Sequence, residues 1–312
     1  MLFGRYLIEC CFENEAILPY FKGSTFRGVF GIALKRVVCA LKQLKCEECL
    51  LSERCLYSRV FERTHGVQDK RKGKKDACPR PFVIEPPLST KTHYPPGSSF
   101  DFNLILFGEY NRYLGYFVYA LDQMGKIGIG KKINGRRGIY CLNAVTYGEA
   151  PVYTKEEKVL KLPEEVEEIV SDDFRKEVRC KKIKVDVITP LRLKFRNRLT
   201  DHLPFHVLVR AMLRRSSALF SWFDDKKLDL DYTGLVRRAE AVETVNSELK
   251  WFDWKRYSNR QDQAMSMGGI IGSVTYRGDL GEFVPFIDFC SRVHLGKQTT
   301  FGLGKISYEI LE

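Results

Sequence analysis

The sequence predicts an α+β protein of two tandem ferredoxin-like domains. The main observation is that signals for strand, helix, strand, strand, helix, glycine turn and strand occur in this order twice along the 312 residues. This is the order of the split β-α-β unit. A chain of this length has room for about two domains. We expect a first domain over 1–150 with a cysteine-containing insertion at 39–78, a charged connector over 151–182 and a second domain over 183–312.

Each expected element follows from its pattern of apolar residues. Ser24 is the expected N-cap of the first helix. The first half is expected to contain a strand at 7–12, a helix at 24–41, strands at 82–84 and 100–107, a helix at 113–123, a glycine turn at 125–138 and a strand at 139–147. The second half is expected to contain strands at 183–188 and 191–195, an amphipathic helix at 205–223, a strand at 270–276, a helix at 282–294, a glycine segment and a strand at 305–311.

The balance of charges indicates a polyanionic partner. The chain has 51 Lys and Arg against 39 Asp and Glu, a formal net charge of +12. This charge favours nucleic acid or an anionic membrane surface over a small neutral substrate. No stretch has the roughly 18 uninterrupted apolar residues of a membrane-spanning helix. Because Arg5 and Glu9 precede any signal-like apolar run, we expect a soluble cytoplasmic protein.

Four of the ten cysteines lie close together in the sequence. Cys39, Cys46, Cys49 and Cys55 have the spacing C-x6-C-x2-C-x5-C. The short Cys46/Cys49 spacing lets two thiolates bind one metal ion. Four sulfur ligands suit structural zinc or an iron–sulfur cluster, which the sequence does not separate. The alternative is a set of four unrelated reduced thiols, since a cytoplasmic chain rarely forms disulfides.

The segment 294–305 is the most distinctive part of the chain. Three glycines permit sharp turns that bring main-chain N–H groups close to an anion. They are Gly296, Gly302 and Gly304. Donors suited to phosphate oxygens or ribose hydroxyls come from four side chains, Lys297, Gln298, Thr299 and Thr300. We therefore predict that this glycine segment binds a phosphate chain.

Further motifs accompany the glycine segment. In the C-terminal half they are Tyr257, Arg260 and the stretches 267–269, 272–276 and 278–280. In the N-terminal half they are the stretches 21–28, 55–57, 61–62 and 81–87, together with the cysteine cluster. Taken together, these motifs resemble the CRISPR-associated precursor-RNA processing endoribonucleases of the RAMP superfamily, and the N-terminal ones are similar to one subgroup.

The resemblance implies two ferredoxin-like, or RNA-recognition-motif-like, domains that cleave CRISPR repeat RNA without a catalytic metal. The 2′-hydroxyl would be the nucleophile, leaving a 2′,3′-cyclic phosphate and a 5′-hydroxyl. Such a reaction requires a base, an acid and cations around the phosphorane. Members of the family commonly carry a catalytic histidine near the first helix, where this chain has none. Tyr20 and Lys22 are the N-terminal candidates for catalysis, and Arg27 and Lys35 the accompanying cations.

His294 is the other catalytic candidate, because it adjoins the glycine segment. As a general acid or base it would act beside the bound phosphate. Phe283, Ile287 and Cys290 share its helical stripe, however, which is also typical of a histidine at the edge of the core.

The candidates for RNA binding are mostly cations near the two glycine turns. Lys297 would neutralise a phosphate, and an aromatic or guanidinium plane would stack on bases. Beyond the glycine segment, the candidates are Lys126, Lys131 and Arg136 at the first turn, Arg210 and Arg214 on a helical stripe with His206, and Tyr257 with Arg260. The alternatives are plain solubility for the lysine-rich turns and a core role for Tyr257.

Two other functions compete with a metal-independent endoribonuclease. A non-catalytic RNA-binding RAMP subunit of a CRISPR effector complex would also carry a glycine-rich helix start such as 23–28. A metal-dependent nuclease would need paired carboxylates, for which Asp229 and Asp231 are the candidates, although their polar surroundings favour a solvated loop. The expected partners are CRISPR repeat RNA and other CRISPR effector subunits, with no membrane.

Overall fold

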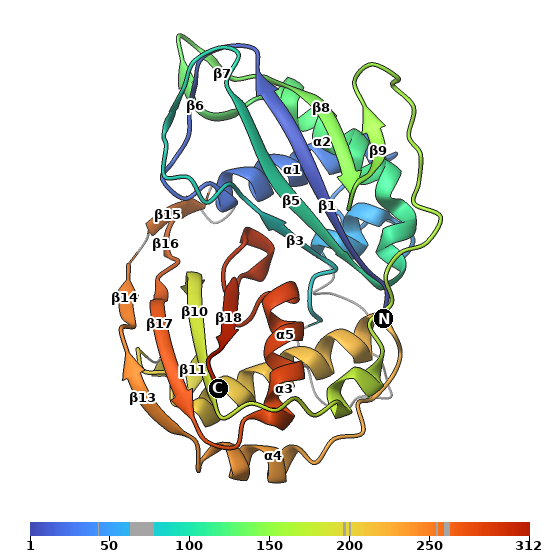
Figure 1. The fold of residues 1–312 in the computed structure, drawn as a ribbon. Helices are drawn as coiled ribbons and strands as arrows, with labels where there is room; N and C mark the ends of the chain where they lie inside the picture. The colour runs from blue at the N-terminus through green and yellow to red at the C-terminus, as the bar shows by residue number, and fades with distance from the viewer. Residues whose placement is uncertain (43, 63–77, 196–197, 200, 254, 259–262) are drawn as a thin grey trace. The chain divides into compact units, whose positions relative to one another are not determined.

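The computed structural model describes residues 1–312 except 43, 63–77, 196–197, 200, 254 and 259–262 (Figure 1). The chain divides into two compact units. The first unit is Leu2–Glu168, and the second unit is Ile169–Glu312 together with Met1. Among the described residues, no helix combines the length and the apolar character needed to cross a bilayer.

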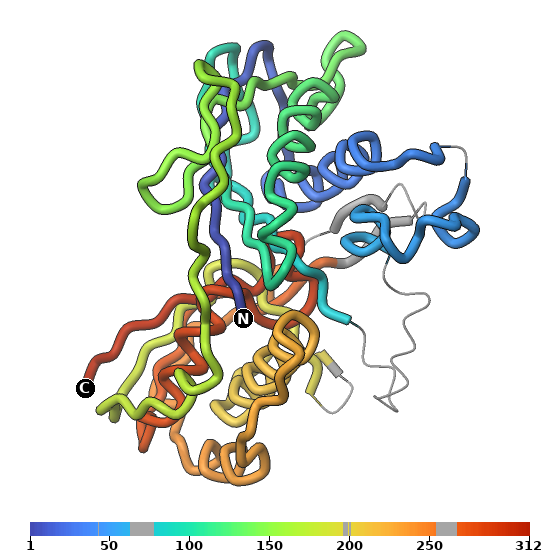
Figure 2. The backbone as a smooth tube through the Cα atoms, turned by 90° about the vertical axis from the view of Figure 1, so that its right-hand side faces the viewer, coloured from blue at the N-terminus to red at the C-terminus, as the bar shows by residue number. Residues whose placement is uncertain are grey.

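The first unit is built around an antiparallel sheet with the strand order β3-β5-β1-β8-β9. Two helices, α1 and α2, cover one face of this sheet, as the turned view in Figure 2 makes clear. The elements are β1 (Phe3–Phe12), α1 (Gly23–Val38), β3 (Phe82–Glu85), β5 (Ser99–Phe107), α2 (Leu114–Ile127), β8 (Tyr140–Tyr147) and β9 (Ala150–Thr154), with short helical turns at Ser58–Glu62 and Gly108–Tyr113. The first four strands in this order are those of a ferredoxin-like unit, so the prediction of fold is confirmed for this half.

Aromatic packing fixes α1 on the sheet. The Phe26 ring lies edge-on to Phe102 at a centroid distance of 5.1 Å, and the Phe30 ring lies 6.0 Å from Phe117 of α2. Both α1 phenylalanines are fully buried, as their helical spacing predicts. The expected N-cap is wrong, however, because α1 begins one residue earlier and the cap position is Lys22, which forms no side-chain capping bond.

A small second sheet joins two distant parts of the first unit. Its order is β4-β2-β6-β7, with β2 (Ala16–Ile17), β4 (His93–Tyr94), β6 (Ile129–Ile133) and β7 (Arg136–Gly138). The turn between β6 and β7 is formed by Asn134 and Gly135, which both have positive φ, 48° and 82°. This is the conformation of a tight two-residue hairpin turn. The expected glycine turn at 125–138 is therefore the end of α2 followed by a hairpin, unlike the glycine segment of the second unit.

The second unit repeats the order of the first. Its sheet has the strand order β13-β17-β10-β18, which matches β3-β5-β1-β8 when strands are numbered within each unit. The elements are β10 (Lys182–Leu191), β11 (Lys194–Phe195), β12 (Arg198–Leu199), α3 (Phe205–Phe223), α4 (Tyr232–Ala239), β13 (Glu243–Ser247), β14 (Lys250–Phe252), β15 (Lys255–Ser258), β16 (Gln263–Ser266), β17 (Gly269–Arg277), α5 (Val284–Val293) and β18 (Ile306–Ile310), with 3-10 turns at Ser171–Arg175, Gly281–Phe283 and Thr299–Phe301.

The helix α3 carries the largest apolar face of the second unit. Phe205 packs against Tyr276 of β17 and against Phe283, at centroid distances of 4.8 and 5.1 Å. α3 also contacts α4 and α5. The sequence predicted the bounds of α3 correctly and missed α4 together with β13 to β16. α4 has no counterpart in the ferredoxin-like order, so it is an addition between α3 and β13.

Candidate functional site

The glycine segment is a compact loop between α5 and β18. Gly296, Gly302 and Gly304 have positive φ of 82°, 77° and 73°. A β-carbon at Gly304 would lie 1.8 Å from the carbonyl oxygen of Leu295, so only glycine fits there. The structure thus agrees with the prediction that this segment needs glycine for its sharp turns.

Several N–H groups of this loop donate within the second unit. Leu295 N donates to Gly304 O at 2.9 Å, Lys297 N to Arg192 O at 3.1 Å, and Gly302 N to Thr299 O at 2.8 Å. The Thr299 and Thr300 side chains are nearly buried, whereas Lys297 is exposed. These N–H groups are taken up inside the unit, and the accessible cation of the loop is the side chain of Lys297, so binding of a phosphate chain by the segment stays a prediction.

Cations gather around Lys297. Burial, together with the charges of Lys194, Arg192 and Arg214, lowers the pKa of Lys297. These four residues come from the loop after β10, from β11, from α3 and from the glycine segment. We call Arg192, Lys194, Arg214 and Lys297 the Lys297 cluster. Like charges held this close to one another repel, so an anion bound among them would be stabilised.

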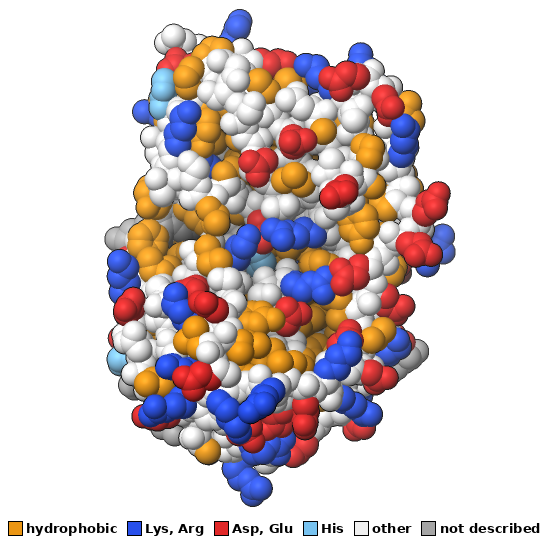
Figure 3. Space-filling view, viewed as in Figure 1, with side chains coloured by type: hydrophobic (Ala, Val, Ile, Leu, Met, Phe, Trp, Pro, Cys, Tyr) orange, Lys and Arg blue, Asp and Glu red, His pale blue; other side chains and the backbone are white. Residues whose placement is uncertain are grey.

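Elsewhere the charge is less concentrated. On the face seen in Figure 3, Lys and Arg side chains alternate with Asp and Glu side chains. Several of the expected RNA-binding cations already have partners. The Arg27 guanidinium lies 5.0 Å from the Phe61 ring centroid, Lys35 Nζ lies 5.4 Å from that of Tyr57, and Lys126 Nζ lies 2.7 Å from Asp122 Oδ2. Lys131 and Arg136 are exposed on the β6–β7 hairpin.

His294 is a core residue. Its side chain is 0% exposed, and Nδ1 lies 3.0 Å from the carbonyl oxygen of Leu303. Its backbone has φ 60° and ψ 151°, a conformation that side chains rarely adopt. Of the two interpretations of the helical stripe, the structure agrees with the core histidine. The buried ring holds the loop from inside, and the role of His294 as an acid or base beside bound phosphate stays a prediction.

Arg215 is a residue of this site that the sequence analysis missed. Its guanidinium donates to the carbonyl oxygens of His294 and Val293, at 3.1 and 2.7 Å. Burial lowers the pKa of Arg215 to about 10. The available signal was an arginine that follows Met212 and Leu213 on the buried side of α3.

The N-terminal candidates meet at the start of α1. Lys22 is fully buried, and its Nζ donates to Ser89 O at 2.5 Å and to Tyr20 O at 3.3 Å. Burial lowers the pKa of Lys22. Tyr20 is 58% exposed. The structure thus brings the two residues together. Lys22 holds the main chain of Tyr20 in place, and the Tyr20 side chain is accessible.

Three further residues, Lys91, His93 and Tyr94, lie in or beside β4. From the sequence, His93 is expected to be a residue of a polar stretch without a functional role, and Lys91 and Tyr94 are not singled out. The 89–94 stretch runs beside Tyr20, because Leu18 N donates to Thr92 O and β2 pairs with β4. His93 Nε2 lies 2.6 Å from Glu15 Oε1, with both side chains about half exposed. Lys91 Nζ lies 5.0 Å from the Tyr94 ring centroid. We call Glu15, Tyr20, Lys22, Lys91, His93 and Tyr94 the β2–β4 patch.

The other histidines and the base-stacking candidates are distributed differently. His202 is exposed beside Asp201, and the His206 ring packs edge-on to Phe195 at 5.7 Å. Tyr257 lies in β15. Arg260 and His65 lie outside the described residues.

The four clustered cysteines do not form a ligand set in the described part of the chain. Cys46 lies near Cys39 and Cys55, whose charges contribute to raising its pKa, although burial contributes most. Among the described residues, no group of three or more His, Cys, Asp or Glu side chains is arranged to hold a metal ion. The predicted ligands, Cys39, Cys46, Cys49 and Cys55, are therefore not placed as a zinc site, and the zinc or iron–sulfur assignment stays a prediction.

The paired carboxylates of a metal-dependent nuclease are also absent at the expected position. Asp231 accepts a hydrogen bond from Gly234 N at 2.8 Å and caps α4. Asp229 forms an ion pair with Arg175 at 3.1 Å. Each carboxylate has its own structural partner, so the polar stretch at 226–232 is partly a helix cap rather than a metal site.

The structure defines a protein of two tandem ferredoxin-like units, with a glycine segment and accompanying cations in the second. Residues 185–306 match the family model of the CRISPR-associated endoribonuclease Cas6. Residues 1–165 match the model of the AF_1859_N N-terminal domain. The chain therefore belongs to the proteins that carry an AF_1859_N N-terminal domain, and its second unit is similar to the Cas6 endoribonucleases.

Individual relatives are distant in sequence. A protein of Archaeoglobus fulgidus, described as uncharacterized, is 28% identical over 259 residues, covering 83% of this chain and 81% of its own length. Thermus thermophilus Cas6 has a TM-score of 0.55 at 13% identity, covering 99% of this chain and 98% of that chain. A Cas6 product complex has a TM-score of 0.58 at 14% identity, covering 99% of this chain and all of that chain. These structures show the same fold.

Proposed function

We propose that this protein is a metal-independent endoribonuclease that cleaves CRISPR repeat RNA within the precursor transcript to release guide RNA. The observation that carries the proposal is the Cas6 family match over 185–306, which contains the glycine segment and the whole Lys297 cluster. A cluster of cations on a ferredoxin-like unit suits an RNA backbone. A solved structure with the same fold is a Cas6 complex with its product, which agrees with a nuclease that holds its cleaved substrate.

The proposed reaction is transesterification within the RNA. The 2′-hydroxyl loses its proton and attacks the adjacent phosphorus, the bond to the 5′ oxygen breaks, and that oxygen gains a proton. The products are a 2′,3′-cyclic phosphate and a 5′-hydroxyl. The protein has to supply proton transfer and positive charge around the phosphorane.

We assign proton transfer to the β2–β4 patch of the first unit. His93 is exposed and its ring is oriented by the Glu15 carboxylate, which is the arrangement of an imidazole that exchanges protons. The Tyr20 hydroxyl is the second candidate, because it is accessible and stands on a backbone that Lys22 fixes. Lys91 contributes positive charge there. Phosphate binding away from the reaction is assigned to the Lys297 cluster.

Assembly with other CRISPR proteins is also part of the proposal. A matching structure is titled a partial complex of Cas6, RT, Cas1 and Cas2, with a TM-score of 0.59 at 12% identity, and the match covers 46% of that chain. The present chain would act in the cytoplasm on the precursor transcript.

Cleavage of the host's repeat RNA in excess chelator tests the proposal. We expect a single cut in each repeat without added metal. Cleavage that begins only after magnesium is restored would contradict the metal-independent reaction. Tight, salt-sensitive binding without any cleavage would instead identify a non-catalytic RNA-binding subunit.

A further inference from the structure

A groove runs between α3 and α4 of the second unit. Leu213 and Val236 contribute apolar contacts to it. Its polar lining consists of Arg210, Arg214 and Ser217 from α3, and of Tyr232, Thr233, Arg237 and Glu240 from α4 and its end. α4 is an addition to the ferredoxin-like order. One wall of the groove is therefore formed by an element that lies outside that order.

The groove has an excess of positive charge. Three arginines and one glutamate line it. Arg210 Nη2 lies 3.8 Å from Glu240 Oε1, and both side chains are about half exposed, so this ion pair holds the arginine weakly. Within the described part of the chain, the side chains of Arg214 and Arg237 form no hydrogen bond and no ion pair. Two exposed guanidinium groups therefore retain their donors for a ligand.

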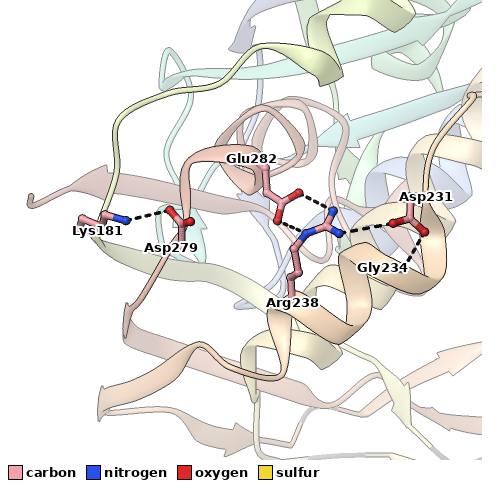
Figure 4. A network of polar contacts seen from close by, with 6 residues as sticks. All are labelled: Lys181, Asp231, Gly234, Arg238, Asp279 and Glu282. Carbon is pink, nitrogen blue, oxygen red and sulfur yellow. Dashed lines mark hydrogen bonds and ion pairs between the residues drawn. The ribbon is translucent and has the colours of Figure 1, made fainter.

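The walls of the groove are held in place by other residues. Ser217 Oγ and Tyr232 Oη are 2.9 Å apart and link the two helices. Arg238 donates to both carboxylate oxygens of Glu282, at 2.6 and 2.7 Å, and lies 3.4 Å from Asp231, the cap of α4 (Figure 4). The neighbouring arginines of α4 thus differ in role: Arg238 fastens the helix, and Arg237 lines the groove.

Arg214 connects this groove to the Lys297 cluster. It lines the groove, and its charge also acts on Lys297. Positive charge therefore continues from the glycine segment along α3 to α4 without leaving the second unit. A ligand that follows this path has to be a chain of anions, because a single phosphate would reach one end of it only.

We propose that the α3–α4 groove binds further phosphates of the RNA strand that the Lys297 cluster holds. The proposal rests on the proposed function, since it takes repeat RNA as the ligand. Guanidinium groups suit this task, because their fork of donors matches two phosphate oxygens. Arg210 and Arg237, on opposite walls, would each contact the phosphodiester backbone and would carry no sequence preference of their own.

The test compares the double variant Arg210→Gln/Arg237→Gln with wild type and with Arg179→Gln. Arg179 is an exposed arginine of the same unit outside the groove. Arg214 is left unchanged, so that the Lys297 cluster stays intact. Because substitutions at exposed positions usually change stability little, all the variants should be folded, and thermal unfolding checks this.

We expect the double variant to bind repeat RNA about ten-fold more weakly at moderate salt, with the slope of log affinity against log salt smaller by roughly 1.4. Arg179→Gln should bind like wild type. Single phosphates of the RNA are then ethylated, and binding is measured for both proteins. At the phosphates that the groove contacts, ethylation should weaken binding by the wild-type protein and leave binding by the double variant unchanged.

Equal affinity and equal salt slope for the double variant and wild type would overturn the proposal. So would ethylation positions that are the same for both proteins. These outcomes are separate from failure of the proposed function, which appears as wild-type protein that binds repeat RNA and does not cut it.

Discussion

Arg215 Nε donates to the carbonyl oxygen of His294, at 3.1 Å, and its Nη2 donates to the preceding carbonyl of Val293, at 2.7 Å. These carbonyls lie at the C-terminal end of α5, where intrahelical partners run out. A partly buried cation of α3 thus satisfies the end of α5 and fixes the residue at which the glycine segment begins. The geometry of the glycine segment therefore depends on a residue outside it.

Replacing Arg215 by methionine should destabilise the second unit. The two carbonyl oxygens would lose their donors, which costs about 1–3 kcal/mol when the groups stay buried. RNA affinity should fall as well, because the loop that carries Lys297 loses its anchor. Arg214→Met is the matched control, since Arg214 is exposed: it should weaken RNA binding with little change in urea unfolding. Unchanged unfolding of Arg215→Met would contradict this role.

Replacing His294 by alanine should affect stability more than chemistry. The variant loses the contact between Nδ1 and Leu303 O, which holds the loop from inside. At saturating RNA, we expect its single-turnover cleavage rate to fall far less than the ~10²–10⁴-fold loss typical of a missing acid or base. A folded variant with a loss of that size would restore His294 as a catalytic residue.

For the β2–β4 patch we expect the opposite: substitutions should affect the cleavage rate more than stability. His93→Gln should lower the single-turnover rate by about 10²-fold or more, with RNA affinity close to that of wild type. Glu15→Gln should have a smaller effect in the same direction, because Glu15 orients the imidazole ring. His202→Gln is the control, since His202 is an exposed histidine of the second unit. A wild-type rate for both His93→Gln and Tyr20→Phe would remove this patch from the mechanism.

RNA affinity should depend on pH through the charge of Lys297. Burial and the neighbouring cations lower its pKa, so in free protein its charge is lost at a lower pH than for an ordinary lysine. The charged form binds phosphate, and affinity should therefore fall as pH rises through this lowered pKa. Lys297→Arg should keep its charge and flatten the profile. The proposal fails at this point if the two proteins have the same pH dependence.

Metal analysis tests the cysteine cluster. Zinc bound by Cys39, Cys46, Cys49 and Cys55 would appear as about one metal ion per chain in protein purified without oxygen. Iron would appear with a visible absorption band. Cys46→Ser should then lose the metal. A metal content near zero would confirm that these are reduced thiols, in agreement with their arrangement in the described residues.

The helices and strands of this protein could be predicted from the sequence where the apolar pattern extends over many residues. The 19 residues of α3 gave a clear helical face, and its bounds were predicted correctly. The eight residues of α4 have apolar positions at helical spacing, but two turns are too short for the pattern to stand out from the polar stretch before it. The first glycine turn looked like the second in composition. Its Asn134-Gly135 pair forms a hairpin turn instead, because both residues adopt positive φ.

The site was harder to predict because its residues are brought together from distant parts of the chain. The helical stripe of His294 was recognised, but periodicity does not separate a buried histidine from one at the edge of a site. Pairing of His93 with Glu15 depends on β2 lying beside β4, two strands of two residues each. Contacts between such short strands leave almost no signal in the sequence.

A repeat RNA with a single 2′-deoxynucleotide at the cleavage position tests the central claim most directly. The wild-type protein should bind this RNA as tightly as it binds the unmodified RNA. In excess chelator the modified RNA should stay uncut, because it lacks the attacking oxygen. The unmodified RNA should be cut under the same conditions and leave a 2′,3′-cyclic phosphate. Cleavage of the deoxy-substituted RNA, or a product with a 5′-phosphate, would contradict attack by the 2′-hydroxyl.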